Sequence, residues 1–134
     1  MDIDGRRRLS PGSTLVALGL GHAVWGLVAY GEPLRDIVRA GVVRAVGDGI
    51  FDTEDARGAR AAGFWFMFAA PLVSGFGYLT EAALRAGDGR AVRVAGGTTL
   101  ALGAMGTAVM PRSGFPAAVP IGLWLLRRGR ALDA

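Results

Sequence analysis

Long apolar runs separated by short polar segments dominate the chain. The first run covers residues 13–31 and contains no Asp, Glu, Lys or Arg. A helix of about twenty apolar residues is long enough to cross the hydrocarbon core of a bilayer. Three further apolar runs follow, at about residues 59–80, 92–110 and 115–126. We therefore predict an all-α protein, a four-helix transmembrane bundle that forms one integral membrane domain over residues 1–134.

The segment between the first two runs has a different pattern. Apolar residues recur at helical spacing between Leu34 and Val46, and charged residues fall between them: Arg35, Asp36, Arg39 and Arg44. Pro33 suits a first helical turn, and Gly47 is placed where a helix commonly ends. A helix with one apolar and one charged face lies in the membrane interface. We predict such an amphipathic helix over residues 33–46.

The fourth run is the shortest. It holds about a dozen apolar residues together with Pro116 and Pro120. A helix of that length barely reaches across a bilayer, so the segment is either re-entrant or relies on a thin local bilayer.

Small residues recur on one side of each predicted span. In the first span Gly12, Gly19 and Gly26 stand seven residues apart, which places them on one helical face. The second and third spans have similar faces: Gly63, Ala70, Ser74, Gly77 and Glu81, and Gly96, Thr99, Gly103 and Gly106. Small residues let membrane helices approach closely. We expect these faces to form helix–helix contacts, with surface left over for a homo-oligomer.

The arginine distribution predicts an orientation. The net charge of +4 comes from arginine, because the chain has no lysine. Three arginines precede the first run, three lie between the second and third runs, and three follow the fourth, whereas the third link has one. The first link, over residues 32–60, is the exception: it has five arginines, but it also carries six acidic residues and is long and structured. Positive residues favour the cytoplasmic side of a membrane. We therefore predict a multi-pass protein of the bacterial cytoplasmic membrane with both termini in the cytoplasm.

Composition excludes several classes of function. The arginines stand at the ends of apolar runs rather than on a basic face with stacking aromatics, so nucleic acid is not an expected partner. The chain has no cysteine, which excludes disulfides, thiol catalysis and cysteine-ligated zinc. An arginine-rich start before an apolar run also describes a secretory signal peptide, but this run is longer than a usual signal core and further runs follow.

Three motifs carry a resemblance to a known family. The first span contains G-x-G-H-x-x-x-G, from Gly19 to Gly26, and the next segment reads E-P-L-R-D-I from Glu32. The third motif is F-W-F…G-x-G, from Phe64 to Gly77. Over about residues 19–126 the chain resembles an uncharacterised family of small four-span bacterial integral membrane proteins. The resemblance implies a membrane bundle and brings no catalytic residues with it.

His22 is the candidate catalytic residue, because ionisable side chains inside a membrane are commonly functional. As acid or base it would serve an enzyme acting on a lipophilic substrate. The structural alternative is an interhelical hydrogen bond to Ser74, Thr98 or Thr99. A single histidine cannot form a bis-His haem or a multi-His metal site within one chain, so we predict no cofactor and no metal.

A ligand pocket is a second hypothesis. Aromatic residues near His22 could form the wall of a pocket for an apolar, isoprenoid-like molecule, although aromatics at the lipid interface explain the same residues. The candidate ligand-binding residues are Trp25, Trp65, Phe66, Ser74 and Glu81. For Glu81 the alternative is an ion pair with Arg85 four residues later. The acidic residues 48, 52, 54 and 55 fit no EF-hand spacing and favour a helix-capping loop over a cation site.

Three functions follow from these features. The leading prediction is a small membrane protein that acts through helix packing or contact with a lipophilic ligand. A membrane-embedded isomerase or cyclase that uses His22 is the first alternative. A small transporter subunit is the second, and it would need polar residues along a whole path, of which the last two spans have few.

Overall fold

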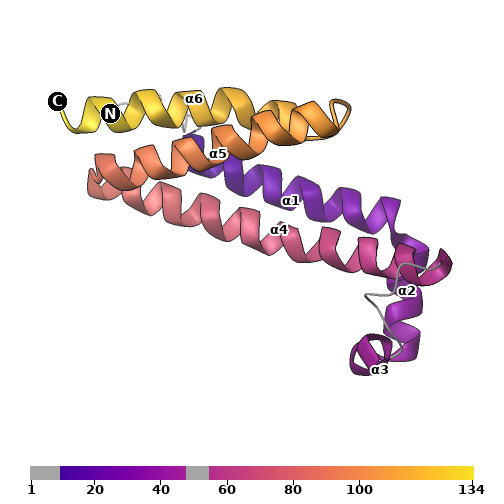
Figure 1. Ribbon diagram of the computed structural model, residues 1–134. Coiled ribbons are helices and arrows are strands. Elements are labelled where there is room, and N and C mark those ends of the chain that lie inside the picture. Colours follow the sequence, from indigo (N-terminus) through magenta and orange to yellow (C-terminus); the bar gives the residue numbers. More distant parts are fainter. Residues whose placement is uncertain (1–9, 48–54) are drawn as a thin grey trace, which may run out of the picture. The chain divides into compact units, whose positions relative to one another are not determined.

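A computed structural model describes residues 10–47 and 55–134 of the chain (Figure 1). The described residues form helices and no strand, which confirms the all-α prediction. The helices are α1 (Pro11–Ala29), α2 (Gly31–Ala40), α3 (Val42–Gly47), α4 (Asp55–Ala86), α5 (Gly89–Val109) and α6 (Phe115–Leu132). By length and composition, two helical stretches among the described residues could cross a membrane: Pro11–Ala29 and Gly58–Ala86.

The chain divides into two compact units, and α1 and α4 contribute to both. The terminal unit comprises Met1–Val16 and Gly75–Ala134, and the inner unit comprises Ala17–Ser74.

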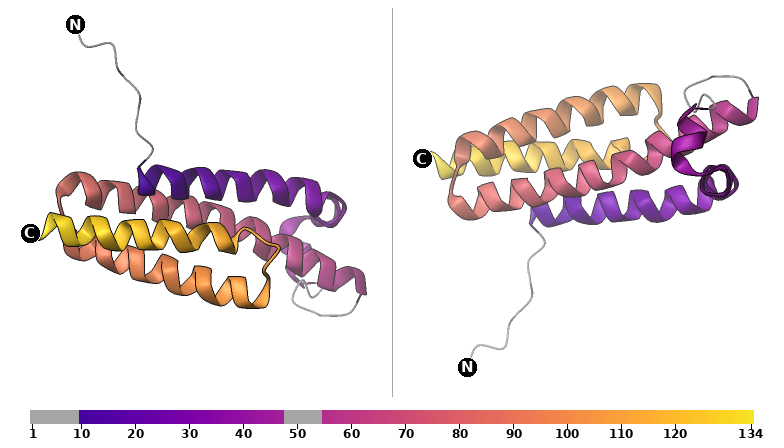
Figure 2. Two further views of the ribbon diagram at one scale, coloured as in Figure 1. Left: turned by 90° about the horizontal axis from the view of Figure 1, so that it is seen from above. Right: turned by 90° about the horizontal axis from the view of Figure 1, so that it is seen from below.

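In the terminal unit, α5 and α6 lie side by side as an antiparallel hairpin (Figure 2). Glycines make this close approach possible: a Cβ atom on Gly96 would lie 2.8 Å from the backbone nitrogen of Leu126, and one on Gly122 would lie 2.6 Å from that of Leu100. The predicted small-residue face of the third span is confirmed, since its four members are buried: Gly96, Thr99, Gly103 and Gly106.

A small apolar core holds the terminal unit together. It contains Leu15 from α1, Val92 from α5, and Ile121 and Leu125 from α6, with Phe76 of α4 packed against it. Four helices thus contribute side chains to one core.

The glycines that recur every seven residues in α1 pack against α4. In the terminal unit a Cβ atom on Gly12 would lie 2.7 Å from the backbone nitrogen of Glu81. In the inner unit one on Gly19 would lie 2.7 Å from the nitrogen of Ser74, and one on Gly26 would lie 2.6 Å from the sulfur of Met67. The partners step back along α4 by seven as the glycines advance by seven, which is antiparallel packing. The glycine faces are therefore occupied within one chain, and a homo-oligomer stays a prediction.

The segment predicted as one amphipathic helix over residues 33–46 forms two helices, α2 and α3. Gly41 has a φ of 80° and separates α2 from α3. A left-handed backbone is available to glycine without a steric penalty, and it cannot be continued as a right-handed helix. The apolar side chains still form one cluster, in which Ile37 and Ala45 are buried beside Leu34 and Phe64.

Helix α4 is longer than the predicted second span and runs through Pro71 without interruption. Likewise α6 continues past residue 126 through Arg127, Arg128 and Arg130, so this fourth segment has 18 helical residues. The link between α4 and α5 is shorter than the predicted 85–93: Gly87 has a φ of 71°, and the Asp88 carboxylate accepts a hydrogen bond from the Ala91 N–H at 2.9 Å. The acidic residues 48, 52 and 54, and the side chain of residue 55, lie outside the described residues.

Candidate functional site

His22 projects from α1 onto the backbone of α4 within the inner unit. Its Nε2 atom lies 3.0 Å from the carbonyl oxygen of Phe66. A carbonyl oxygen only accepts hydrogen bonds, so Nε2 carries the proton and donates. The imidazole also stacks on the Phe66 ring, with centroids 3.7 Å apart and planes 12° apart, and the Tyr30 ring lies 5.2 Å from the same phenyl ring. The contact ties two helices together at a half-buried position.

The three hydroxyl partners predicted for His22 do not take this role. Ser74 lies against Gly19, and the Thr99 hydroxyl donates to the Ala95 carbonyl at 2.8 Å. Thr98 is exposed. In the described part of the chain, no carboxylate or hydroxyl lies within hydrogen-bond distance of the imidazole.

Of the predicted ligand-binding residues, the structure places Phe66 against His22 and leaves both tryptophans on the outside. The Trp25 residue is 64% exposed and Trp65 is 51% exposed. Trp65 makes edge contacts with Phe64 and Phe68, with ring centroids 5.4 and 5.8 Å apart. These aromatics form an outer cluster rather than a closed wall around the imidazole.

Glu81 belongs to the terminal unit, where it joins two helices. Its Oε1 lies 3.2 Å from Nε of Arg85, which is the ion pair predicted at a spacing of four residues. Its Oε2 accepts a hydrogen bond from the Ser10 hydroxyl at the start of α1. Ser10 and Ser13 also exchange backbone-to-hydroxyl hydrogen bonds of 3.0 Å, which satisfies N–H groups of the first turn. The Ser-Pro step at residues 10–11 signals this helix start, but it does not reveal the link to Glu81.

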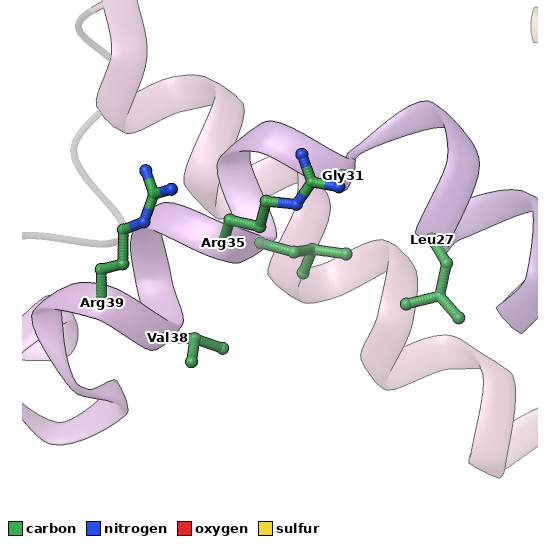
Figure 3. A pocket seen from close by; sticks show the side chains of 6 residues that line it. Leu27, Gly31, Arg35, Val38 and Arg39 are labelled. Atoms are coloured by element: carbon green, nitrogen blue, oxygen red, sulfur yellow. The ribbon is translucent and has the colours of Figure 1, made fainter.

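An open groove in the inner unit was not foreseen from the sequence. It has a volume of about 470 Å³ and is formed where α1 ends and α2 begins (Figure 3). Its lining combines apolar and basic residues: Leu27, Gly31, Leu34, Arg35, Val38 and Arg39. The sequence does contain a signal for this groove. Leu34 and Val38 are four residues apart, as are Arg35 and Arg39, so two apolar and two basic side chains lie on adjoining strips of one helix.

A second open groove, of about 380 Å³, lies in the terminal unit beside the turn from α4 to α5. Leu79, Val94 and Ala95 are among its lining, and Asp88 and Arg90 stand at it. Within the described ranges, no group of three or more His, Cys, Asp or Glu residues could hold a metal ion.

Comparisons with known proteins define the family. Neither the curated proteins nor the solved structures include one that matches this chain. The model of a family of unknown function (DUF6463) matches residues 6–131, nearly the whole sequence, and the chain therefore belongs to that uncharacterised family.

Proposed function

We propose that this protein is a multi-pass integral membrane protein of the bacterial cytoplasmic membrane in which α1, α4, α5 and α6 each cross the bilayer. It acts through contact between lipophilic molecules and a bundle of closely packed helices.

The observation that carries this proposal is that small residues are buried in the long helices, whereas large apolar side chains are exposed. The buried positions of the long helices are mainly small residues, among them Gly12, Gly19, Gly77, Gly96, Gly103 and Gly122. The large apolar side chains point outward, and each long helix has several: Leu20, Val24 and Leu27; Leu72 and Leu79; Val94, Leu102 and Met105; and Leu123 and Trp124. A water-soluble protein places such side chains in its core and keeps exposed apolar patches small. In lipid the arrangement is the expected one, because helices associate there through small residues and tolerate apolar exteriors.

The charges of the terminal unit support a membrane orientation. Arginines gather where α4 ends, where α5 begins and where α6 ends: Arg85, Arg90, Arg93, Arg127, Arg128 and Arg130. The antiparallel hairpin brings the last two of these places together, and Arg93 forms an ion pair with Asp133. The positive-inside rule places this end in the cytoplasm.

The length of the hairpin decides how deep it can reach. From Val94 to Val109 helix α5 has no charged residue, and fifteen helical steps rise about 22 Å. That is somewhat less than a hydrocarbon core of about 30 Å, a difference that snorkelling arginines and local thinning can accommodate. Because α5 and α6 pack tightly along each other, they cross together.

Single cysteines test the topology, and the cysteine-free parent chain provides a background without labelling. The substitutions are Glu32→Cys, Ala86→Cys, Ser113→Cys and Ala134→Cys, one in each link and one at the C-terminal residue. Each variant is exposed to a membrane-impermeant maleimide in sealed right-side-out vesicles, before and after permeabilisation. We expect residues 32 and 113 to react in sealed vesicles, and residues 86 and 134 to react only after permeabilisation.

Each alternative gives its own pattern. Reaction of residues 113 and 134 from the same side would show that α6 is re-entrant. Reaction of all four only after permeabilisation, with release of the protein by alkaline carbonate, would refute membrane insertion altogether.

A further inference from the structure

We propose that the groove at the junction of α1 and α2 binds an anionic phospholipid. Arg35 and Arg39 hold the phosphate, and one acyl chain lies along Leu27, Leu34 and Val38. The inference rests on the proposed membrane insertion and adds to it a ligand class and a site.

The apolar part of the groove is built for a chain-like molecule. Leu34 packs on the buried Ile37 and Ala45 and forms the base of the groove, while the Val38 residue is 73% exposed. A Cβ atom on Gly31 would have no atom within 4 Å, so this position leaves the space between Leu27 and α2 open. Apart from the two arginines, the lining consists of glycine and the apolar residues Leu27, Leu34 and Val38. Such a lining favours a hydrocarbon chain over a polar metabolite.

The two arginines of the groove present their guanidinium groups on one side of α2. Arg35 and Arg39 are one helical turn apart, and both guanidinium groups point to the same side of α2 in Figure 3. Among the described residues Arg35 has no ion pair or hydrogen bond. Arg39 lies 3.8 Å from Asp36, but the Arg39 side chain is 77% exposed and such a pair is weak. Each guanidinium group can donate two parallel hydrogen bonds to phosphate oxygens.

The acidic residues of α2 do not cancel this charge in the groove. Neither Glu32 nor Asp36 lines it. At 100° per residue, the two arginines stand between the apolar strip of Leu34 and Val38 and the two acids, so a headgroup at the edge of the groove meets the guanidinium groups first.

The surroundings favour a lipid as the source of the phosphate. In α3, which adjoins α2, Val42 is 53% exposed and Val43 is 88% exposed. An apolar surface of this kind beside basic side chains is typical of a helix at the level of lipid headgroups. A soluble phosphate would use the arginines alone and leave the groove unfilled.

The test uses the full chain purified in a neutral detergent. Its thermal unfolding midpoint is measured with dioleoyl phosphatidylglycerol, with dioleoyl phosphatidylcholine and with inorganic phosphate. We expect the midpoint to rise with phosphatidylglycerol only. In the double variant Arg35→Gln/Arg39→Gln the apparent Kd for phosphatidylglycerol should weaken by about tenfold or more, since hydrogen bonds to charged groups are the stronger kind.

Two comparisons separate the groove from general electrostatics. The double variant Arg127→Gln/Arg128→Gln removes the same charge from exposed positions on α6 and should keep the lipid response. Gly31→Leu fills the groove while both arginines remain, and it should abolish the response, whereas Gly97→Leu, at another glycine with open space around it, should not.

Four results would overturn the proposal: an equal response to phosphatidylcholine, an equal response to inorganic phosphate, an unchanged response in Arg35→Gln/Arg39→Gln, or an unchanged response in Gly31→Leu. The cysteine topology pattern is read separately. If that pattern is as expected and the lipid response is absent, the lipid site alone fails; if the chain does not insert, the proposed function fails as well.

Discussion

Gly19 offers the sharpest test of the packing between α1 and α4. A Cβ atom at this position would lie 2.7 Å from the backbone nitrogen of Ser74 and 2.9 Å from the carbonyl oxygen of Ala70. Both are backbone atoms of a helix, so no side-chain rotation relieves the clash. Gly19→Ala therefore forces the two helices apart along this stretch.

The expected cost is set by two opposing effects. Alanine favours a helix over glycine by about 1 kcal/mol. Against this, an added methyl in a well-packed contact costs typically about 1–3 kcal/mol, and separating the helices also weakens dispersion contacts at neighbouring positions. Gly21→Ala is the matched control, because it is on the same helix, is exposed and has no atom within 4 Å of its Cβ position. The control keeps only the favourable effect.

We expect Gly19→Ala to be less stable than Gly21→Ala by about 1–3 kcal/mol, the cost of an overpacked contact. The free energy of unfolding is measured for the parent and both variants by titration with a denaturing detergent, followed by circular dichroism. Equal stability of the two variants would refute close packing at Gly19. A more stable Gly21→Ala beside an unfolded Gly19→Ala would mean that the contact is worth more than we infer.

The remaining predictions concern single hydrogen bonds. Replacing His22 with alanine removes the bond to the Phe66 carbonyl and the ring stack, and should lower the free energy of unfolding by about 1 kcal/mol or somewhat more; His22→Phe keeps the stack and should recover part of the loss. A His22→Ala variant as stable as the parent, but no longer stabilised by lipophilic ligands that stabilise the parent, would instead make His22 a ligand-binding residue. Replacing Asp88 with alanine removes the bond to the Ala91 N–H and should cost about 1 kcal/mol in the same assay, whereas Asp88→Asn should retain most of the stability. If the asparagine variant loses as much as the alanine variant, the carboxylate acts through its charge rather than as a cap.

Much of the helical architecture could be predicted from the sequence, because neighbouring residues in the chain specify helices of this kind. Apolar runs and their charged ends depend on residues a few positions apart, so the positions of four long helices were accessible from pattern alone. The seven-residue recurrence of Gly12, Gly19 and Gly26 likewise identified the packed face of α1, since helical periodicity converts spacing directly into a shared face.

Helix ends and breaks were less predictable. The break at Gly41 depends on a left-handed backbone conformation, which glycine permits but does not require. Pro71 lies inside α4, although proline commonly ends or kinks a helix. The full length of α6 was missed because its last turns are rich in arginine and the apolar pattern stops before them.

The helical class and the small-residue faces could be predicted from the chain alone, because both follow from residue size and periodicity along a single helix. What each polar group contacts depends on how separate helices pack. His22 binds a backbone carbonyl, which every residue has and no side-chain pattern marks, and Ser10 meets Glu81 across 71 positions of the sequence. The groove beside Arg35 exists because α2 turns away from α1 next to Gly31, which brings Leu27 of α1 and Leu34 of α2 to one surface that the pattern of neither helix predicts.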